Sequence, residues 1–317
     1  MDSFKHRARA GISAALLALI AGAAQGGAPQ SGRDGAECAT QGTALGAMLE
    51  TEYAFGEQAL TSVRGAFLKY LDQDSWVLNP GPEPGRAVYE AAKDSKDQLT
   101  WYPVIGDVAP SGDLGFTTGP WVYTVADSGK QLYGHFLSVW VRDAECKWHV
   151  KIDGGISHAA PANAEPKLPA DPAAIARANL PPPVLVTHDA AGRAAGDFRD
   201  TAERDGLAAA LRTYGRNNDF LFLTNAQFPI GGVGPASAYL DAHAIDGTWV
   251  EKSRGRSNDA TLAYSVGVLT GGKAQTTHAY VQIWQYDSKV ANWGLRVLLV
   301  TKNVPRAVDQ GVGRSTN

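Results

Sequence analysis

The stretch QLYGHFLSVWVRDAECKWHVKID, residues 131–153, decides the fold. Apolar and aromatic residues dominate it on both sides of a short polar segment, Asp143–Glu145. Two such runs joined by so short a turn are typical of a β-hairpin. Similar runs with short Gly- and Asp-containing connections precede it. The sequence therefore predicts an antiparallel meander with strands at residues 99–108, 114–125, 131–141 and 147–153.

Helical patterns come before these strands. Apolar residues recur every three or four positions from Leu45 to Leu60 and again from Val63 to Leu71, which is the spacing of one face of a helix. Helices followed by an antiparallel sheet define an α+β architecture. We therefore expect N-terminal helices that pack on a sheet.

The chain repeats this pattern. Trp140 and Trp284 are 144 residues apart, and strand-like residues surround both. Trp148 and Trp293 follow at a spacing of 145 residues. A repeat of this length is too long for a solenoid unit, so each copy is expected to be a whole domain. The predicted fold is α+β with two tandem domains.

A segment rich in proline and alanine separates the two copies. It ends in Pro181–Pro183 and is typical of a stiff linker. The predicted organisation is a signal peptide at residues 1–26, a first domain at 40–158, a linker at 159–189, a second domain at 190–305 and a flexible tail at 306–317.

The N-terminus has the pattern of a secretory signal. Lys5, Arg7 and Arg9 precede an uncharged Ala- and Leu-rich run at residues 11–24, and small residues follow. The run is shorter than the roughly 17–25 residues that cross a bilayer. We therefore expect an exported protein, periplasmic or secreted, that has no membrane contact once the signal is cleaved.

Two cysteines remain after cleavage. In an oxidising compartment, Cys38 and Cys146 are candidates for a disulfide, and two separate thiols are the alternative. Neither belongs to a Cys-x-x-Cys motif for metal or redox chemistry.

Charge and motifs exclude several classes of function. The formal net charge is -3 and no dense basic run follows the N-terminus, which argues against a nucleic-acid partner. The sequence contains no His-Glu-x-x-His motif, no phosphate-binding loop and no Gly-x-Ser-x-Gly motif, and its histidines lack metal-ligand spacing. We therefore expect neither a metal site nor a cofactor.

Three motifs in the first copy carry a family resemblance. They are Trp101-x-Pro103, the turn and strand SGDLGFTTGPW at residues 111–121, and Trp148-x-Val150-x-x-Asp153. Together they resemble the SnoaL-like group of nuclear-transport-factor-2-like domains, which includes many secreted bacterial proteins of undefined function.

The resemblance implies a cone-shaped domain, in which a strongly bent antiparallel sheet wraps around helices and leaves a pocket at its open end. Relatives include isomerases and cyclases that use pocket carboxylates, histidines and tyrosines without a cofactor. Because members of the group often pair through their sheets, the two domains are expected to form a pseudo-dimer within the chain, or the chain a homodimer.

The length of the hairpin turn decides which residues face each other. With a three-residue loop at Asp143–Glu145, Trp140 lies opposite Trp148 on an apolar face, and His135 lies opposite Asp153 on the other face. A four-residue loop shifts this register. In the first register, Asp153 would raise the basicity of His135 for proton transfer, which makes them a candidate catalytic pair. A surface pair without function is the alternative.

The second copy lacks these features. Its segment Asn258–Tyr264 stands where the glycine-containing turn should be and has no glycine. The positions of His135 and Asp153 hold Ala279 and Leu298. If the polar pair has a function, only the first domain is expected to be active.

Aromatic side chains with few convergent charges favour ligand binding. The predicted function is an exported protein that binds a small, partly apolar molecule, with an aromatic-lined pocket in each cone, the first being the functional one. The candidate ligand-binding residues are Tyr53, Trp101, Trp121 and Tyr133. The alternative is a cofactor-free acid/base enzyme of isomerase, cyclase or hydrolase type that uses His135 and Asp153, so whether the chain is an enzyme stays open.

Overall fold

The computed structural model describes residues 38, 41–78, 81–168, 190–271, 277–288 and 290–302. These residues all belong to the unit Ala36–Asn317, one of the two into which the chain divides. The predicted signal peptide (1–26), the predicted tail (306–317) and residues 169–189 of the predicted linker lie outside the described residues. We call residues 41–168 lobe one and residues 190–302 lobe two.

Lobe one begins with helices, as the apolar periodicity predicts. Helix α1 buries Leu45, Met48, Leu49 and Phe55 on one face. Helix α2 begins after Ser62, whose side chain caps it by accepting a hydrogen bond from Gly65 N at 2.9 Å. The elements of lobe one are α1 (Gln41–Thr61), α2 (Val63–Tyr70), β1 (Leu71–Leu78), β2 (Pro82–Pro84), α3 (Gly85–Ala91), β3 (Gln98–Trp101), β4 (Ile105–Val108), β5 (Leu114–Thr124), β6 (Gln131–Arg142) and β7 (Trp148–His158).

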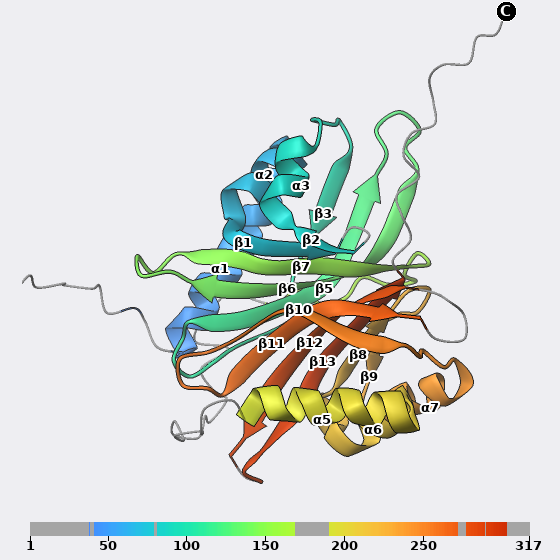
Figure 1. The fold of residues 1–317 in the computed structure, drawn as a ribbon. Coiled ribbons are helices and arrows are strands. Elements are labelled where there is room, and N and C mark those ends of the chain that lie inside the picture. Colours follow the sequence, from blue (N-terminus) through green and yellow to red (C-terminus); the bar gives the residue numbers. More distant parts are fainter. Residues whose placement is uncertain are drawn as a thin grey trace, which may run out of the picture. The chain divides into compact units, whose positions relative to one another are not determined.

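The strands of lobe one form a sheet of order β2-β1-β7-β6-β5-β3, with β4 also paired to β5. Strands β5, β6 and β7 are the predicted antiparallel meander, and the three helices gather beside this sheet (Figure 1). The predicted strand at 99–108 is divided into β3 and β4, because Pro103 lies between them and has no N–H for the ladder. Strand β1 adds to β7 in parallel.

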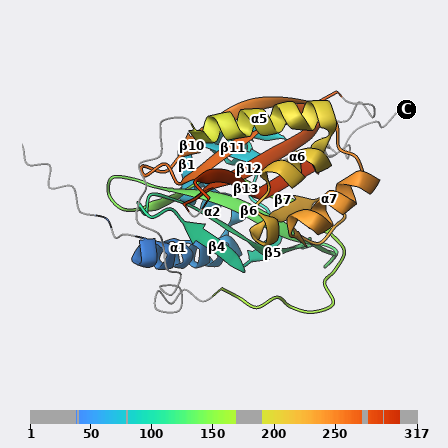
Figure 2. The same ribbon diagram turned by 90° about the horizontal axis from the view of Figure 1, so that it is seen from below.

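Lobe two repeats this architecture with sheet order β10-β11-β12-β13-β8-β9, and β8 is likewise parallel to β13. Helix α5 contacts β10, β12 and β13, and Figure 2 shows it lying across these strands. The elements are α5 (Ala190–Asp205), α6 (Leu207–Tyr214), the short helix η1 (Asn217–Asp219), β8 (Leu221–Thr224), β9 (Ile230–Gly231), α7 (Val233–Ala242), β10 (Thr248–Arg256), β11 (Leu262–Thr270), β12 (His278–Asp287) and β13 (Asn292–Lys302). The predicted α+β class with two helix-and-sheet copies is confirmed.

The two sheets share an apolar core. Aliphatic side chains of β5, β6 and β7 pack there against side chains of β8, β11, β12 and β13. Two equivalent turns exchange hydrogen bonds at the edge of this core: Ser111 N donates to Asp259 at 2.7 Å, and Asn258 N donates to Asp113 at 3.0 Å. This reciprocity is what a two-fold symmetric dimer interface shows, here within one chain.

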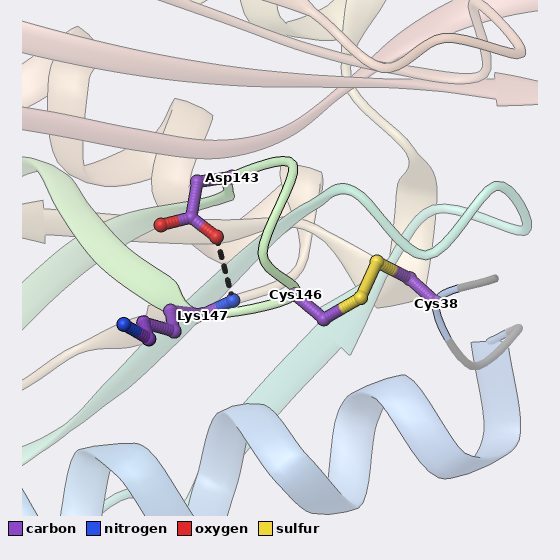
Figure 3. Close-up of a disulfide and its surroundings, with 4 residues drawn as sticks. All are labelled: Cys38, Asp143, Cys146 and Lys147. Atoms are coloured by element: carbon purple, nitrogen blue, oxygen red, sulfur yellow. Dashed lines mark hydrogen bonds between the residues drawn. A yellow bond between two sulfur atoms is a disulfide. The ribbon is translucent and has the colours of Figure 1, made fainter. Parts of the chain in front are cut away.

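The hairpin between β6 and β7 differs from the predicted one. Its loop has five residues, since Arg142 and Trp148 are the last pair. Asp143 closes the loop by accepting from Lys147 N at 2.8 Å (Figure 3). Both predicted loop lengths, three and four residues, are therefore wrong. Cys146 in this loop has a φ of 63°, a left-handed conformation that the tight turn imposes.

A β-bulge changes the register again along the same hairpin. Trp140 pairs with Val150, but Val139 pairs with Ile152, so Lys151 is the extra residue. Val150 packs in the core on the helix side of the sheet, whereas Ile152 packs in the core between the sheets. The bulge thus moves Asp153 to the helix side.

Lobe two has a bulge at the equivalent place, where Arg296 is the extra residue between Leu295 and Val297. Lys151 and Arg296 occupy matching positions of the sequence repeat. The repeat therefore extends to an irregularity of the backbone, which supports its assignment as two copies of one fold.

Cys38 and Cys146 form a disulfide in the structure, with Cα atoms 5.5 Å apart. Figure 3 shows the bond joining the segment that leads into α1 to the β6–β7 loop. Of the two alternatives that the sequence left open, the structure contains the pairing.

Candidate functional site

Lobe one contains a cavity of about 700 Å³, which we call the lobe-one pocket. Helices α2 and α3 form one wall, and strands β1, β3, β5, β6 and β7 form the others. Aromatic side chains account for much of the surface: Phe67, Tyr89, Trp101, Trp121, Tyr123 and Phe136. A volume of this size is within the range of small-molecule sites.

Asp153 is the carboxylate on the β7 wall of this pocket. It accepts a hydrogen bond from Ser138 Oγ at 2.8 Å. Burial raises the pKa of Asp153 to about 7, and the nearby charge of Glu52 acts in the same direction. A carboxyl group with this pKa is able to gain or lose a proton near neutral pH.

Glu52 lies on α1 behind the pocket wall, 1% exposed. It accepts hydrogen bonds from Trp101 Nε1 at 2.6 Å, from Thr117 Oγ1 at 2.5 Å and from Trp140 Nε1 at 3.1 Å. Burial raises the pKa of Glu52, while these donors oppose the shift. Glu52 therefore holds the Trp101 indole in place, and Trp101 in turn lines the pocket.

Glu52 is not among the site residues predicted from the sequence. A signal was present, because Glu52 falls on the same helix face as Leu45, Met48, Leu49 and Phe55. A carboxylate in an apolar stripe implies buried donors.

The predicted ligand-binding residues separate into two groups. Trp101 and Trp121 line the lobe-one pocket. Tyr53 does not line it: its hydroxyl donates to Leu168 O at 2.6 Å. Tyr133 donates to Gln131 Oε1 at 2.7 Å and lines a different cavity.

The predicted pairing of His135 with Asp153 is wrong. His135 lies opposite Ile156, and Asp153 lies opposite Ser138, because the longer loop and the bulge together shift the register. The two residues also line different cavities. The raised basicity expected for His135 from Asp153 is therefore absent.

His135 lies beside a second cavity of about 240 Å³, which we call the histidine pocket. Its side chain is buried and joins a chain of hydrogen bonds. Nδ1 of His135 lies 2.7 Å from Nε2 of His158, and Nε2 of His135 lies 2.7 Å from Oε1 of Glu165. Burial lowers the pKa of His135, and the charge of Glu165 opposes this shift.

The positions of the protons in this chain of hydrogen bonds follow from its last acceptor, the carbonyl oxygen of Ala159. His158 Nδ1 lies 2.7 Å from Ala159 O, and a carbonyl oxygen can only accept, so this nitrogen carries a proton. Nε2 of a neutral His158 then accepts, and His135 Nδ1 donates to it. One further proton must lie between His135 Nε2 and Glu165. Both nitrogens of His135 are thus engaged, which leaves no free lone pair for a substrate.

We expect His158 to be the neutral tautomer with its proton on Nδ1, and His135 to carry a proton on Nδ1. Nitrogen chemical shifts of the labelled imidazoles, measured by NMR near neutral pH, report both. The Glu165→Gln variant should retain both protons, because its amide can donate to His135 Nε2. Rapid exchange between tautomers in the wild-type protein would contradict this assignment of the protons on His135 and His158.

Lobe two does not reproduce the polar site. Leu298 occupies the position of Asp153, and the equivalent interior is filled by the buried rings of Phe198, Trp249, Tyr280 and Trp284. A cavity of about 200 Å³ lies beside Trp284, between α5 and strands β10 and β11. This cavity is much smaller than the lobe-one pocket, and the carboxylate in its lining is Glu251.

In the described ranges, no group of three or more His, Cys, Asp or Glu side chains is arranged to hold a metal ion. Helices long and apolar enough to span a bilayer are likewise absent from these ranges.

Neither a protein-family model nor a curated protein matches the chain. Among solved structures, a protein of unknown function from Shewanella oneidensis, described as NTF-2 like, is similar at 16% identity and a TM-score of 0.30, over 36% of this chain and 97% of that one. A ketosteroid isomerase-like protein from Erwinia carotovora atroseptica is similar at 16% identity and a TM-score of 0.32, over 38% and 100%. A Nostoc punctiforme protein of unknown function with a cystatin-like fold has 13% identity and a TM-score of 0.29, over 38% and 95%.

Each of these solved structures is similar to about a third of this chain. The fold and the site define this chain as a two-lobed α+β protein with one large pocket in lobe one among its described residues.

Proposed function

We propose that the protein binds a small, largely apolar molecule in the lobe-one pocket. The observation that carries this proposal is the cavity of about 700 Å³ with aromatic walls and a half-buried carboxyl group, Asp153, whose pKa is raised. Apolar walls with a few placed polar groups are the usual composition of a small-molecule site. Trp101, held from behind by Glu52, and Trp121 supply rigid aromatic surface for such a ligand.

Acid/base catalysis in the same pocket is the second candidate function. The observation that favours it is the pKa of Asp153, raised to about 7. A general acid or base works best when its pKa is near the ambient pH. In this candidate Asp153 alone moves the proton, since His135 faces another cavity.

We also propose that the protein is exported after cleavage of an N-terminal signal peptide. The cationic and apolar N-terminal segment has the pattern of a signal peptide, and the disulfide between Cys38 and Cys146 suits an oxidising compartment. Determination of the mature N-terminus after expression in a secreting host tests this part. A chain that begins at Met1 would contradict it.

A pocket-blocking variant tests the binding function. Ala92 lines the pocket, so Ala92→Trp should fill part of it and lower the affinity for anilinonaphthalene sulfonate, an apolar fluorescent probe, by about tenfold or more. Leu60→Trp adds the same side chain at an exposed position outside the pocket and is the matched control. Fluorescence titration measures both, and native mass spectrometry shows whether a molecule co-purifies with the wild type alone. Equal affinity in the two variants would overturn the proposal.

A further inference from the structure

Asn225 of lobe two reaches the pocket of lobe one. It directly follows β8, yet it lines the cavity beside Ser157 of β7. Among the described lining residues it is the one that lobe two contributes. The two backbones are joined here, because Ala226 N donates to Ser157 O at 2.8 Å. One end of the pocket is therefore built by both lobes.

The orientation of the Asn225 amide is determined by its partners. Oδ1 accepts from the backbone N–H of Lys302 at 3.2 Å, and a backbone N–H can only donate, so this atom is the oxygen. Oδ1 also accepts from Thr301 Oγ1 at 2.5 Å. Nδ2 is then turned toward Ser157, to whose hydroxyl it donates at 3.2 Å. Lobe two thus presents an oriented N–H donor at this end of the pocket.

The pocket has a second polar group, Asp153, on the same strand as Ser157. Asp153 and Ser157 are four residues apart on β7, which corresponds to about 13 Å along a strand. Gly155 lies between them and contributes no side chain to the floor. Trp121 covers this stretch: a Cβ placed on Gly155 would lie 3.3 Å from the Trp121 indole nitrogen. The Trp121 indole therefore lies between the two polar ends.

We propose that Asn225 is a specificity-determining residue of the lobe-one pocket, which takes an elongated, largely apolar molecule with a polar group at each end. A hydroxyl or carbonyl oxygen accepts from Asn225 at one end, and a hydroxyl meets Asp153 at the other. Lobe two then completes the site in addition to packing against lobe one. This inference rests on the proposed binding function.

Two matched probes test it on the full mature chain. They are the α,ω-diol of decane, with a hydroxyl at each end, and decanol, with one. Calorimetry should show tighter binding of the diol to the wild type. Asn225→Leu is of similar size but has neither a donor nor an acceptor for a hydroxyl, so it should weaken the diol about 5- to 15-fold and leave decanol nearly unchanged. Asn292→Leu makes the same substitution at the exposed first residue of β13 and should bind both probes like the wild type.

A second variant acts from outside the pocket. Thr301→Val deletes the hydroxyl that holds Oδ1 of Asn225, so it should weaken the diol in the same direction but by only about 2- to 3-fold. It serves as the test if Asn225→Leu folds poorly. A diol preference that survives both changes, or equal binding of the two probes to the wild type, overturns the role of Asn225 and leaves the binding function standing. Binding of neither probe, with anilinonaphthalene sulfonate equally unaffected by Ala92→Trp, contradicts both.

Discussion

Replacing Asp153 with asparagine is expected to stabilise the protein at about pH 8 and to leave its stability almost unchanged near pH 4. The pKa of this carboxyl is raised by burial from 3.8 to about 7. Between these two values the unfolded chain releases the proton while the folded chain keeps it. The folded state then binds more protons, so the free energy of unfolding of the wild type falls as pH rises.

The size of this effect follows from the same linkage. Each pH unit in that window lowers the free energy of unfolding by about 1.4 kcal/mol, and the whole window amounts to at most about 4 kcal/mol. Asparagine does not titrate, and its carbonyl oxygen can still accept from Ser138. Urea denaturation at about pH 4, 6 and 8 should show the gain in the variant growing through the window and reaching a plateau above about pH 7.

Asp97 supplies the matched control. It lines the same pocket, but hydrogen bonds from Tyr123 and from the backbone of Ala126 lower its pKa. For a carboxyl of this kind the ionised form is favoured by folding, so Asp97→Asn should destabilise the protein near neutral pH. A difference between Asp153→Asn and wild type that is independent of pH would contradict the assignment of Asp153.

The same Asp153→Asn variant separates the two candidate functions. If the pocket binds a ligand without catalysing a reaction, the variant should change the ligand affinity modestly, because one hydrogen bond is altered. Under acid/base catalysis, turnover of any substrate found for the pocket should fall about 10²- to 10⁴-fold while binding persists.

Removal of the disulfide is the second large effect that we expect. The bond closes a loop with a sequence separation of 108 residues, and the double variant Cys38→Ser, Cys146→Ser releases the unfolded chain from it. For a loop of this length the chain-entropy model gives a loss of about 3–5 kcal/mol in the free energy of unfolding. Denaturant titration of the variant measures it.

Reduction of the wild-type protein is the control for this variant. Wild type in excess thiol should lose the same amount of stability, and the double variant should not respond to thiol. The Asp143–Lys147 contact keeps the loop closed without the bond, so the β6–β7 hairpin should persist in the reduced form (Figure 3). Unchanged stability after reduction would show that the disulfide does not constrain the unfolded chain.

The architecture was accessible from the sequence because it depends on local patterns. Apolar periodicity predicted α1 and α2, and apolar runs bounded by short turns predicted β5 and β6 nearly to their ends. The tryptophan spacing predicted the second copy. These signals come from residues close together in the chain or from a direct comparison of two segments.

The candidate site was predicted only in part. Asp153, Trp101 and Trp121 lie in the lobe-one pocket, whereas His135 was assigned to the wrong cavity. The error came mainly from the bulge at Lys151. The longer loop alone shifts the register by two residues and keeps His135 and Asp153 on one face, whereas one extra residue exchanges the two faces of the strand.

The sequence by itself determined the order of helices and strands and the tandem repeat. It also determined the contrast between a polar first copy and an apolar second one, since Leu298 occupies the position that corresponds to Asp153. Only the tertiary structure decided three further features: that the bulge at Lys151 turns Asp153 into the pocket, that Glu52 holds Trp101 and Trp140, and that Asn225 closes the cavity from lobe two. The physical reason is that each depends on packing between residues about 50 or more positions apart, or on a backbone irregularity, and neither leaves a periodic pattern in the chain.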